Sequence, residues 1–228
     1  MIRNFTIVDV DQGSPEWFAA RAGRVTGSVA AHIAATLKSG GEPAGRRDLR
    51  TRLALERICG RSLEDDFENA DMARGHDLEP MARAAYELQT GAIVQETGFL
   101  SHNELMIGAS LDGHIGDWAG IVEFKCPRPA NHLKYLRAGV AYPIMPPEHR
   151  YQLLHNMFVS GAHWADLASY SPEFPEPLRL FVVRLDRAEA ELQAYELVLR
   201  LFLTEIEKEQ AAILALTTKA EPTSSETG

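Results

Sequence analysis

The chain has few cysteines, and this limits the metal and redox chemistry that it can support. Its 228 residues include only Cys59 and Cys126, which form no C-x-x-C pair. Two cysteines are too few to ligate an iron–sulfur cluster, and they disfavour a zinc ribbon or a structural disulfide. The sequence therefore argues against the cysteine-based sites as a group.

The chain also lacks an excess of basic residues and any long apolar run. Its 32 acidic and 23 basic residues give a net charge of −9, which argues against a general polyanion binder. A nucleic-acid partner would have to enter a local basic groove. The apolar runs are too short to span a bilayer, and the N-terminal segment lacks the apolar core of a signal peptide. We therefore expect a cytoplasmic protein with no membrane partner.

What the sequence has is the composition of a globular protein, with 45% hydrophobic and 24% charged residues. Its length is sufficient for one domain with a substantial core. The segment 217–228 is rich in Thr, Ser, Glu and Pro and has almost nothing to bury. We therefore expect a single domain over residues 1–216 and a disordered tail over 217–228.

Capping residues and apolar spacing predict the order of helices and strands. Ser14 and Pro15 favour a helix start, Ser28 can cap a second helix, and Gly23 and Gly60 favour helix ends. Helices are predicted at 15–22, 28–37, 48–59, 79–88, 129–138, 147–159 and 187–216, and strands at 92–100, 105–111, 121–126, 164–169 and 178–185. This order predicts an α/β fold with a mixed central β-sheet flanked by helices, a helical N-terminal third and a long C-terminal helix.

The most informative residues are Asp112, Glu123 and Lys125. Side chains alternate along a strand, so Glu123 and Lys125 should share one face of the apolar segment 121–126. Two carboxylates can hold a hard divalent cation, and a lysine can orient water or stabilise charge on a phosphate. The set therefore suggests metal-assisted cleavage of a phosphodiester. The alternative is a surface hairpin with an Asp-Gly turn and a solvent-facing Glu/Lys pair.

Four other residues fit the same chemistry, although each has an ordinary structural interpretation. Glu79, just before Pro80, could be a third acid near the metal or a carboxylate in the first turn of a helix. Gln152 could contact water or phosphate, or be a half-exposed amide on an amphipathic helix. Arg21 and Ser28 could form a phosphate pocket, or be a surface arginine and an N-cap serine.

Taken together and in this order, these elements resemble the phage-type exonuclease and recombinase family, which includes lambda exonuclease and the YqaJ-like viral recombinases. The resemblance covers about residues 11–200. Its most distinctive part is the pentad Glu-Phe-Lys-Cys-Pro behind an Asp-Gly turn. The matching elements are Trp17, Arg21, Thr26-Gly27-Ser28, Arg74-Gly75 with Glu79, Ser110-Leu111-Asp112-Gly113, Glu123 to Pro127, and Gln152.

The resemblance implies a restriction-endonuclease-like core and Mg²⁺-dependent 5′→3′ degradation of duplex DNA, with Mn²⁺ as a substitute metal. By match, Asp112, Glu123 and the backbone carbonyl of Phe124 would ligate the metal. Lys125 would orient the attacking water, and two further residues, Glu79 and Gln152, would complete the catalytic site. Arg21 and Ser28 match positions that resemble a 5′-phosphate anchor.

The resemblance also implies partners: double-stranded DNA ends, a single-strand annealing protein, and copies of the same chain in a ring-shaped trimer. No basic cluster in the sequence marks a channel through such a ring. Two other functions stay open at this point. One is an endonuclease on the same core, which would cut circular DNA. The other is a non-catalytic DNA-binding or assembly module, against which the intact Asp/Glu/Lys set argues.

Overall fold

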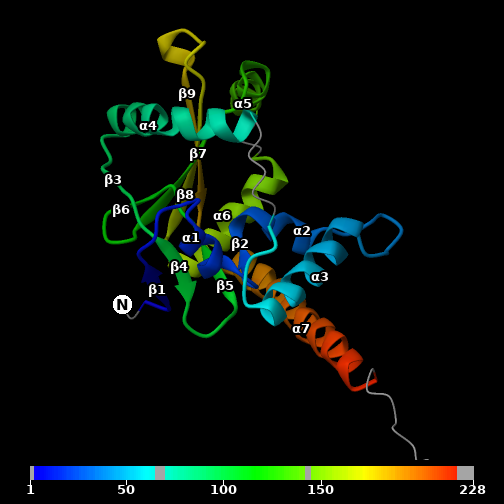
Figure 1. The fold of residues 1–228 in the computed structure, drawn as a ribbon. Coiled ribbons are helices and arrows are strands. Elements are labelled where there is room, and N and C mark those ends of the chain that lie inside the picture. Colours follow the sequence, from blue (N-terminus) through cyan, green and yellow to red (C-terminus); the bar gives the residue numbers. More distant parts are fainter. Residues whose placement is uncertain (1–2, 65–69, 142–144, 220–228) are drawn as a thin grey trace, which may run out of the picture.

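The strands form two sheets in the computed structural model, which describes residues 3–64, 70–141 and 145–219 (Figure 1). The five-stranded sheet has the order β3-β6-β7-β8-β9 and is mixed, because β7 and β8 are parallel and its other neighbours are antiparallel. The four-stranded sheet has the order β1-β4-β5-β2. The strands are β1 Phe5–Val8, β2 Val25–Thr26, β3 Val94–Gln95, β4 Phe99–His102, β5 Ile107–Ala109, β6 Gly113–Ile115, β7 Gly120–Lys125, β8 Trp164–Tyr170 and β9 Leu180–Asp186.

Seven α-helices and two short 3₁₀ turns accompany the strands within the described residues. They are α1 Pro15–Arg21, α2 Ala30–Ala34, α3 Ala44–Cys59, α4 Ala70–Thr90, α5 Pro129–Ala141, α6 Pro147–Ser160 and α7 Glu189–Lys219, with turns η1 Gly27–Val29 and η2 Glu176–Leu178. Helices flank a mixed sheet, so the predicted α/β fold class is confirmed. In the described part of the chain, no helix is both long and apolar enough to cross a membrane.

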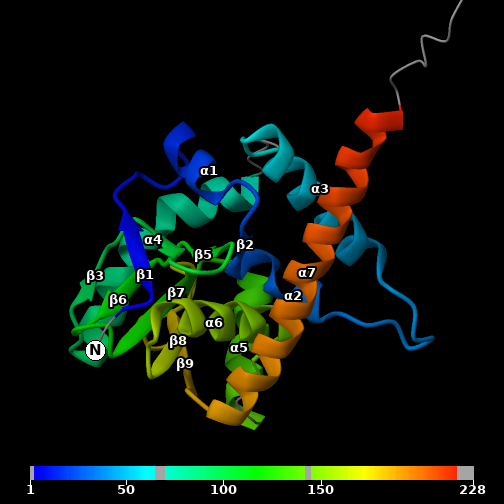
Figure 2. The same cartoon turned by 90° about the horizontal axis from the view of Figure 1, so that it is seen from below.

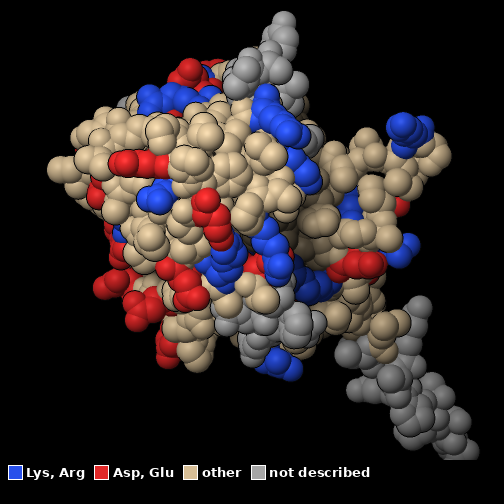
Figure 3. Space-filling view, turned by 90° about the horizontal axis from the view of Figure 1, so that it is seen from above, with Lys and Arg blue, Asp and Glu red and all other residues tan. Residues whose placement is uncertain are grey.

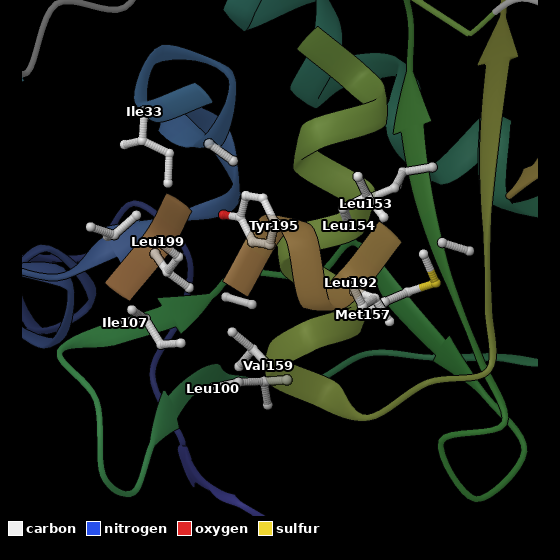
Figure 4. Close-up of a cluster of buried hydrophobic side chains, with 14 of the residues drawn as sticks. Ile33, Leu100, Ile107, Leu153, Leu154, Met157, Val159, Leu192, Tyr195 and Leu199 are labelled. Atoms are coloured by element: carbon white, nitrogen blue, oxygen red, sulfur yellow. The ribbon is translucent and has the colours of Figure 1, made fainter. Parts of the chain in front are cut away.

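The larger hydrophobic core lies where α6 and α7 meet α2 and the four-stranded sheet. Buried side chains from α6 and α7 interdigitate there with Ile33 of α2 and Ile107 of β5 (Figure 4). Helix α7 also runs beside α3 and α2, as Figure 2 shows. Burying these apolar surfaces together fixes α6 against the sheets, and α6 carries Gln152.

A second, smaller core lies between α4 and the five-stranded sheet. It contains Tyr86 of α4 together with Val122 and Phe124 of β7 and Tyr170 of β8. Strand β7 is therefore covered on both faces, and all of its residues except Lys125 are buried. The residues of β7 that point away from α4 point toward α6.

Several predicted boundaries are wrong. Helix α4 begins nine residues before the predicted start at Glu79, so Glu79 lies inside the helix rather than in its first turn. Ser28 lies in the η1 turn and caps no helix, since α2 starts at Ala30 without a side-chain cap. Strands β1, β2 and β6 were not predicted, and the predicted strand 92–100 is divided between β3 and β4.

The C-terminal helix is longer than predicted. Helix α7 continues to Lys219, so the first three residues of the predicted tail 217–228 are helical. Residues 220–228 lie outside the described part of the chain.

Candidate active site

Strand β7 brings Glu123 and Lys125 to one face, as the sequence predicted. Lys125 Nζ donates a hydrogen bond to Glu123 Oε1 over 2.7 Å. The alternate residues Val122 and Phe124 pack in the α4 core on the other face. Because only 4% of the Glu123 surface is exposed, its charge depends on these protein partners. The solvent-facing Glu/Lys pair of the surface-hairpin interpretation is therefore wrong for Glu123.

Helix α6 supplies two more donors to the same carboxylate. Gln152 Nε2 donates to Glu123 Oε1 over 2.6 Å, and Asn156 Nδ2 lies 3.5 Å from Glu123 Oε2. Gln152 and Asn156 are four residues apart, so they share a face of the helix. The predicted site residue Gln152 thus lies in the site. Asn156 was missed, although its position one turn beyond Gln152 is the signal that could have found it.

Asp112 reaches the site from the loop between β5 and β6. Its Oδ2 atom accepts a hydrogen bond from the backbone N–H of Phe124 over 2.7 Å, which fixes the carboxyl group beside β7. Burial, followed by the negative charge of Glu123, raises the pKa of Asp112 well above its ordinary value. Asp112 and Glu123 are therefore close enough for their negative charges to repel one another.

Glu79 approaches the two acids from α4. It forms an ion pair with Arg83 over 3.3 Å, and Arg83 also donates to the backbone oxygen of Asp112 over 3.3 Å. Burial raises the pKa of Glu79; Arg83 opposes this effect and Glu123 adds to it. Glu79 thus belongs to the same electrostatic cluster, and Arg83 connects it to the Asp112 loop.

The donor set fits a divalent cation of the Mg²⁺ type. Mg²⁺ in proteins is commonly held by one or two carboxylates, with water and phosphate completing its coordination. Asp112 and Glu123 supply two carboxylates, and their mutual repulsion is what a cation would relieve. Among the described residues, no cluster of three or more His, Cys, Asp or Glu side chains forms a ready-made metal cage. The fit therefore rests on the two carboxylates.

Lys125 is held in its charged form. Burial by itself would lower the pKa of Lys125, but the charges of Glu123 and then Asp112 outweigh burial and raise the pKa. About a third of the side chain is exposed (31%), so Lys125 lies partly open to solvent. In this arrangement Lys125 can donate hydrogen bonds to water or phosphate, and it is not a proton acceptor at neutral pH.

The residues predicted to anchor a phosphate lie together in a second pocket. The Arg21 guanidinium stacks on the Trp17 ring, 4.1 Å from its centre, and contacts the Ser110 and Thr26 hydroxyls at 3.3 and 3.5 Å. Thr26 Oγ1 is 3.2 Å from the exposed Ser28 hydroxyl. Arg21 itself is buried, with 9% exposure, so the alternative interpretation as a surface arginine is wrong.

Two contacts join the group around Arg21 to the acidic site. Ser110, for which the sequence predicted no role, accepts a hydrogen bond from Trp17 Nε1 over 2.9 Å. It precedes Asp112 by two residues. Gly27, between Thr26 and Ser28, packs so closely on α6 that a Cβ atom there would lie 2.3 Å from Asn156 Oδ1. The structure therefore brings all the predicted site residues into two adjoining groups.

The fold is that of the phage-type exonuclease class. The alkaline exonuclease LHK-Exo from Laribacter hongkongensis has a similar structure, with a TM-score of 0.80, 34% identity, and coverage of 91% of this chain and 100% of that chain. Its complex with dAMP gives a TM-score of 0.80, 33% identity and the same coverage. A phage-related exonuclease from Haemophilus somnus 129PT shares the fold at 14% identity, with a TM-score of 0.63 and coverage of 85% and 96%.

The chain belongs to the family of the YqaJ-like viral recombinase domain, whose model matches residues 16–163. That range contains every site residue named above, from Arg21 to Asn156. A comparison with curated proteins finds no match.

Proposed function

We propose that the chain is a metal-dependent deoxyribonuclease that degrades double-stranded DNA from 5′ ends, prefers a 5′-phosphate and acts in phage-type recombination. The observation that carries the proposal is the set around Glu123, where Asp112, Lys125 and Gln152 converge in a chain of this family. The neighbouring Arg21 pocket supports the 5′-phosphate preference, because an arginine beside hydroxyl groups recognises phosphate oxygens.

The charge distribution removes one objection to DNA as the substrate. Although the net charge is −9, Figure 3 shows several Lys and Arg side chains near one another across the middle of one face, with some acidic side chains among them and many more toward its left edge. A local group of this kind can accept a phosphate backbone in a protein that is acidic as a whole.

The residues divide the chemistry among them. Asp112, Glu123 and the Phe124 carbonyl would hold Mg²⁺, or Mn²⁺ in its place, and a bound ion would activate water and neutralise charge on the phosphate. Lys125 would orient the attacking water and stabilise the negative charge that builds up on the scissile phosphate. Gln152 and Asn156 keep the Glu123 carboxylate in position, and Glu79 would be the third acid of the catalytic site.

The family also supports proposals about assembly. A ring-shaped trimer would hold DNA during repeated cleavage, and a single-strand annealing protein would receive the strand that remains.

Digestion of labelled DNA tests the proposed reaction. A linear duplex carrying a 5′-phosphate should be shortened from its 5′ ends only when Mg²⁺ or Mn²⁺ is present, and a covalently closed circle of the same sequence should stay intact. Cutting of the circle would instead favour an endonuclease. Stable binding of the linear duplex without cleavage in either metal would favour the non-catalytic DNA-binding module.

A further inference from the structure

A carboxylate lies inside the arginine pocket that is proposed to bind the DNA end. Glu64 follows α3, and its Oε1 atom is 2.8 Å from Arg52 Nη1. Its Oε2 atom is 3.4 Å from Nη2 of Arg21. The pocket is lined by these three side chains and by Arg24, Thr26 and Ser62, among others. Two arginines thus share one carboxylate, with each oxygen turned toward a different guanidinium.

Arg21 is held in place, but its hydrogen bonds are weak. Its contacts with Ser110, Thr26 and Glu64 are all between 3.3 and 3.5 Å, whereas charge-assisted bonds of this kind are usually shorter than about 3 Å. Its Nε atom is buried, and no residue in the described part of the chain accepts a hydrogen bond from it. Burial lowers the pKa of Arg21, and the charge of Glu64 opposes that effect. The guanidinium therefore has hydrogen-bond donors that an anion could use, but the side chains fill the pocket, so an anion can enter only if one of them moves.

The other acid of the pocket, Glu56, is occupied by hydrogen bonds to the backbone. Both oxygens of Glu56 accept backbone hydrogen bonds, from Gly23 over 2.8 Å and from Leu63 over 3.0 Å. Glu56 therefore serves the local chain path of α3 and the loop that follows it. Glu64 makes no such backbone contact with its carboxylate among the hydrogen bonds of the described residues, and its closest partners there are the two arginines.

These contacts lead to one inference, which rests on the end-anchoring function proposed above. We infer that Glu64 is an internal counter-ion that competes with the terminal 5′-phosphate of DNA for Arg21 and Arg52, and so sets how tightly the phosphate is held. An incoming phosphate dianion and Glu64 cannot both be fully paired with the same two guanidinium groups. Like charges brought together in a partly buried pocket repel strongly.

Such competition suits an enzyme that moves along its substrate. Each cleavage leaves a new terminal phosphate, which must enter the pocket after the previous product has left. A pocket with two unopposed arginines would hold each phosphate too long. Glu64, with its longer contact to Arg21, can give way to the phosphate and return when it leaves. Arg52 pairs with Glu64 when the pocket is empty and becomes a second contact for the phosphate when Glu64 moves away.

The test measures binding of two blunt duplexes that differ only in a 5′-phosphate or a 5′-hydroxyl, with Ca²⁺ present in place of Mg²⁺. Glu64→Gln keeps the size of the side chain and removes its charge. We expect this variant to bind the phosphorylated duplex at least about fivefold more tightly than wild type, with little change for the hydroxyl duplex. Glu64→Ala should shift the ratio in the same direction.

Glu42→Gln is the matched control. Glu42 is likewise shared by two arginines, Arg46 and Arg50, at 2.6 and 2.5 Å, but it lies outside the phosphate pocket. Its loss should leave the ratio of phosphate to hydroxyl binding unchanged. Thermal melting of all three variants verifies that they are folded.

The outcomes separate this inference from the function on which it rests. If wild type prefers the phosphorylated duplex and both Glu64 variants show the wild-type ratio or a lower one, Glu64 is a structural support and the inference is overturned alone. If wild type has no preference and Arg21→Ala changes nothing, the end anchor itself is wrong, and the inference is overturned with it.

Discussion

At the scale of single residues, Glu123 explains why part of the site was predictable. Alternation along a strand is a local rule, so the sequence alone could place Glu123 and Lys125 on one face. The contact with Asn156 depends instead on how α6 packs across the sheet. Glu64 is harder still, because an isolated acid after a helix gives no signal that two arginines will surround it. Local rules place these two side chains on one face of β7, whereas tertiary packing determines which residues surround them.

Substitution of Lys125 by alanine tests the chemical step. Lys125 is expected to act on charge that develops during cleavage, so its loss should lower kcat by about 10²–10³-fold. Binding of the duplex and of the metal should persist, since neither is assigned to this side chain. Single-turnover cleavage, compared with duplex binding, measures the two effects separately.

Lys134→Ala is the control for the loss of a lysine charge. Lys134 is exposed on α5, where it donates to Asn131 over 2.8 Å. Its removal should leave single-turnover cleavage close to the wild-type rate. Near-normal digestion by Lys125→Ala would show that the role given to this lysine is wrong.

At the scale of elements, the helix starts were the least predictable feature. Pro80 suggested a helix that begins near Glu79, because proline is favoured in a first turn. The structure has Pro80 inside α4, where packing of Ala82 and Tyr86 on the five-stranded sheet helps to hold the helix together. Strand β6 was missed for another reason. Its three residues begin with Gly113 and follow a strong turn signal, so the apolar pattern is too short to recognise.

Substitution of Gly27 by alanine tests whether η1 and α6 must approach this closely. The new Cβ would lie 2.3 Å from Asn156 Oδ1 and 3.3 Å from Gln152 Cγ. Either the turn or α6 must move, and overpacking of this kind destabilises a protein by about 1–3 kcal/mol. Because both α6 residues position Glu123, cleavage should fall as well. Chemical denaturation and single-turnover rates measure the two effects.

Gly75→Ala is the stability control for that experiment. Gly75 lies inside α4, and a Cβ there would meet nothing within 4 Å. Alanine is the better helix former, so the variant should gain about 0.5–1 kcal/mol of unfolding free energy. Equal stability losses at Gly27 and Gly75 would mean that the close approach of η1 to α6 has no special role.

At the scale of the whole molecule, the pairing of the strands could not be predicted from the sequence. The order of helices and strands predicted a mixed sheet with helices around it, and that class is confirmed. Which strands pair is decided by contacts far apart in the chain. The antiparallel pairing of β1 with β4 joins Phe5 to His102, and no local pattern connects them. This pairing creates the second sheet, against which α6 is buried.

One buried histidine links α6 to both β5 and α7. His155 Nε2–H donates to the Gly108 carbonyl over 3.0 Å, so Nδ1 is the acceptor for the Tyr195 hydroxyl at 2.7 Å. Both bonds use the neutral imidazole. Burial lowers the pKa of His155 to about 4, although the hydrogen bond to Gly108 opposes this effect. Protonation of His155 therefore opposes the native packing of three elements.

The stability of the whole fold should depend on this group below neutral pH. The unfolded chain binds a proton at an ordinary histidine pKa of about 6.5, whereas the folded chain does not until about pH 4. Its contribution is complete above the unfolded pKa and is lost as the pH falls toward the folded one. From about pH 7.5 to about pH 5 this group should remove about 2 kcal/mol of unfolding free energy. Chemical denaturation of wild type at a series of pH values measures the slope.

His155→Gln separates this effect from that of the carboxylates. Glutamine can donate to Gly108 and accept from Tyr195 without gaining a proton, so the variant should lose less stability between the two pH values than wild type does. At neutral pH it should be somewhat less stable, because its shape fits the site less well. Parallel pH dependences for the two proteins would mean that His155 is protonated as readily in the folded chain as in the unfolded one. In that case the junction of α6, α7 and β5 would have to tolerate a buried charge, which the two hydrogen bonds of the neutral ring do not support.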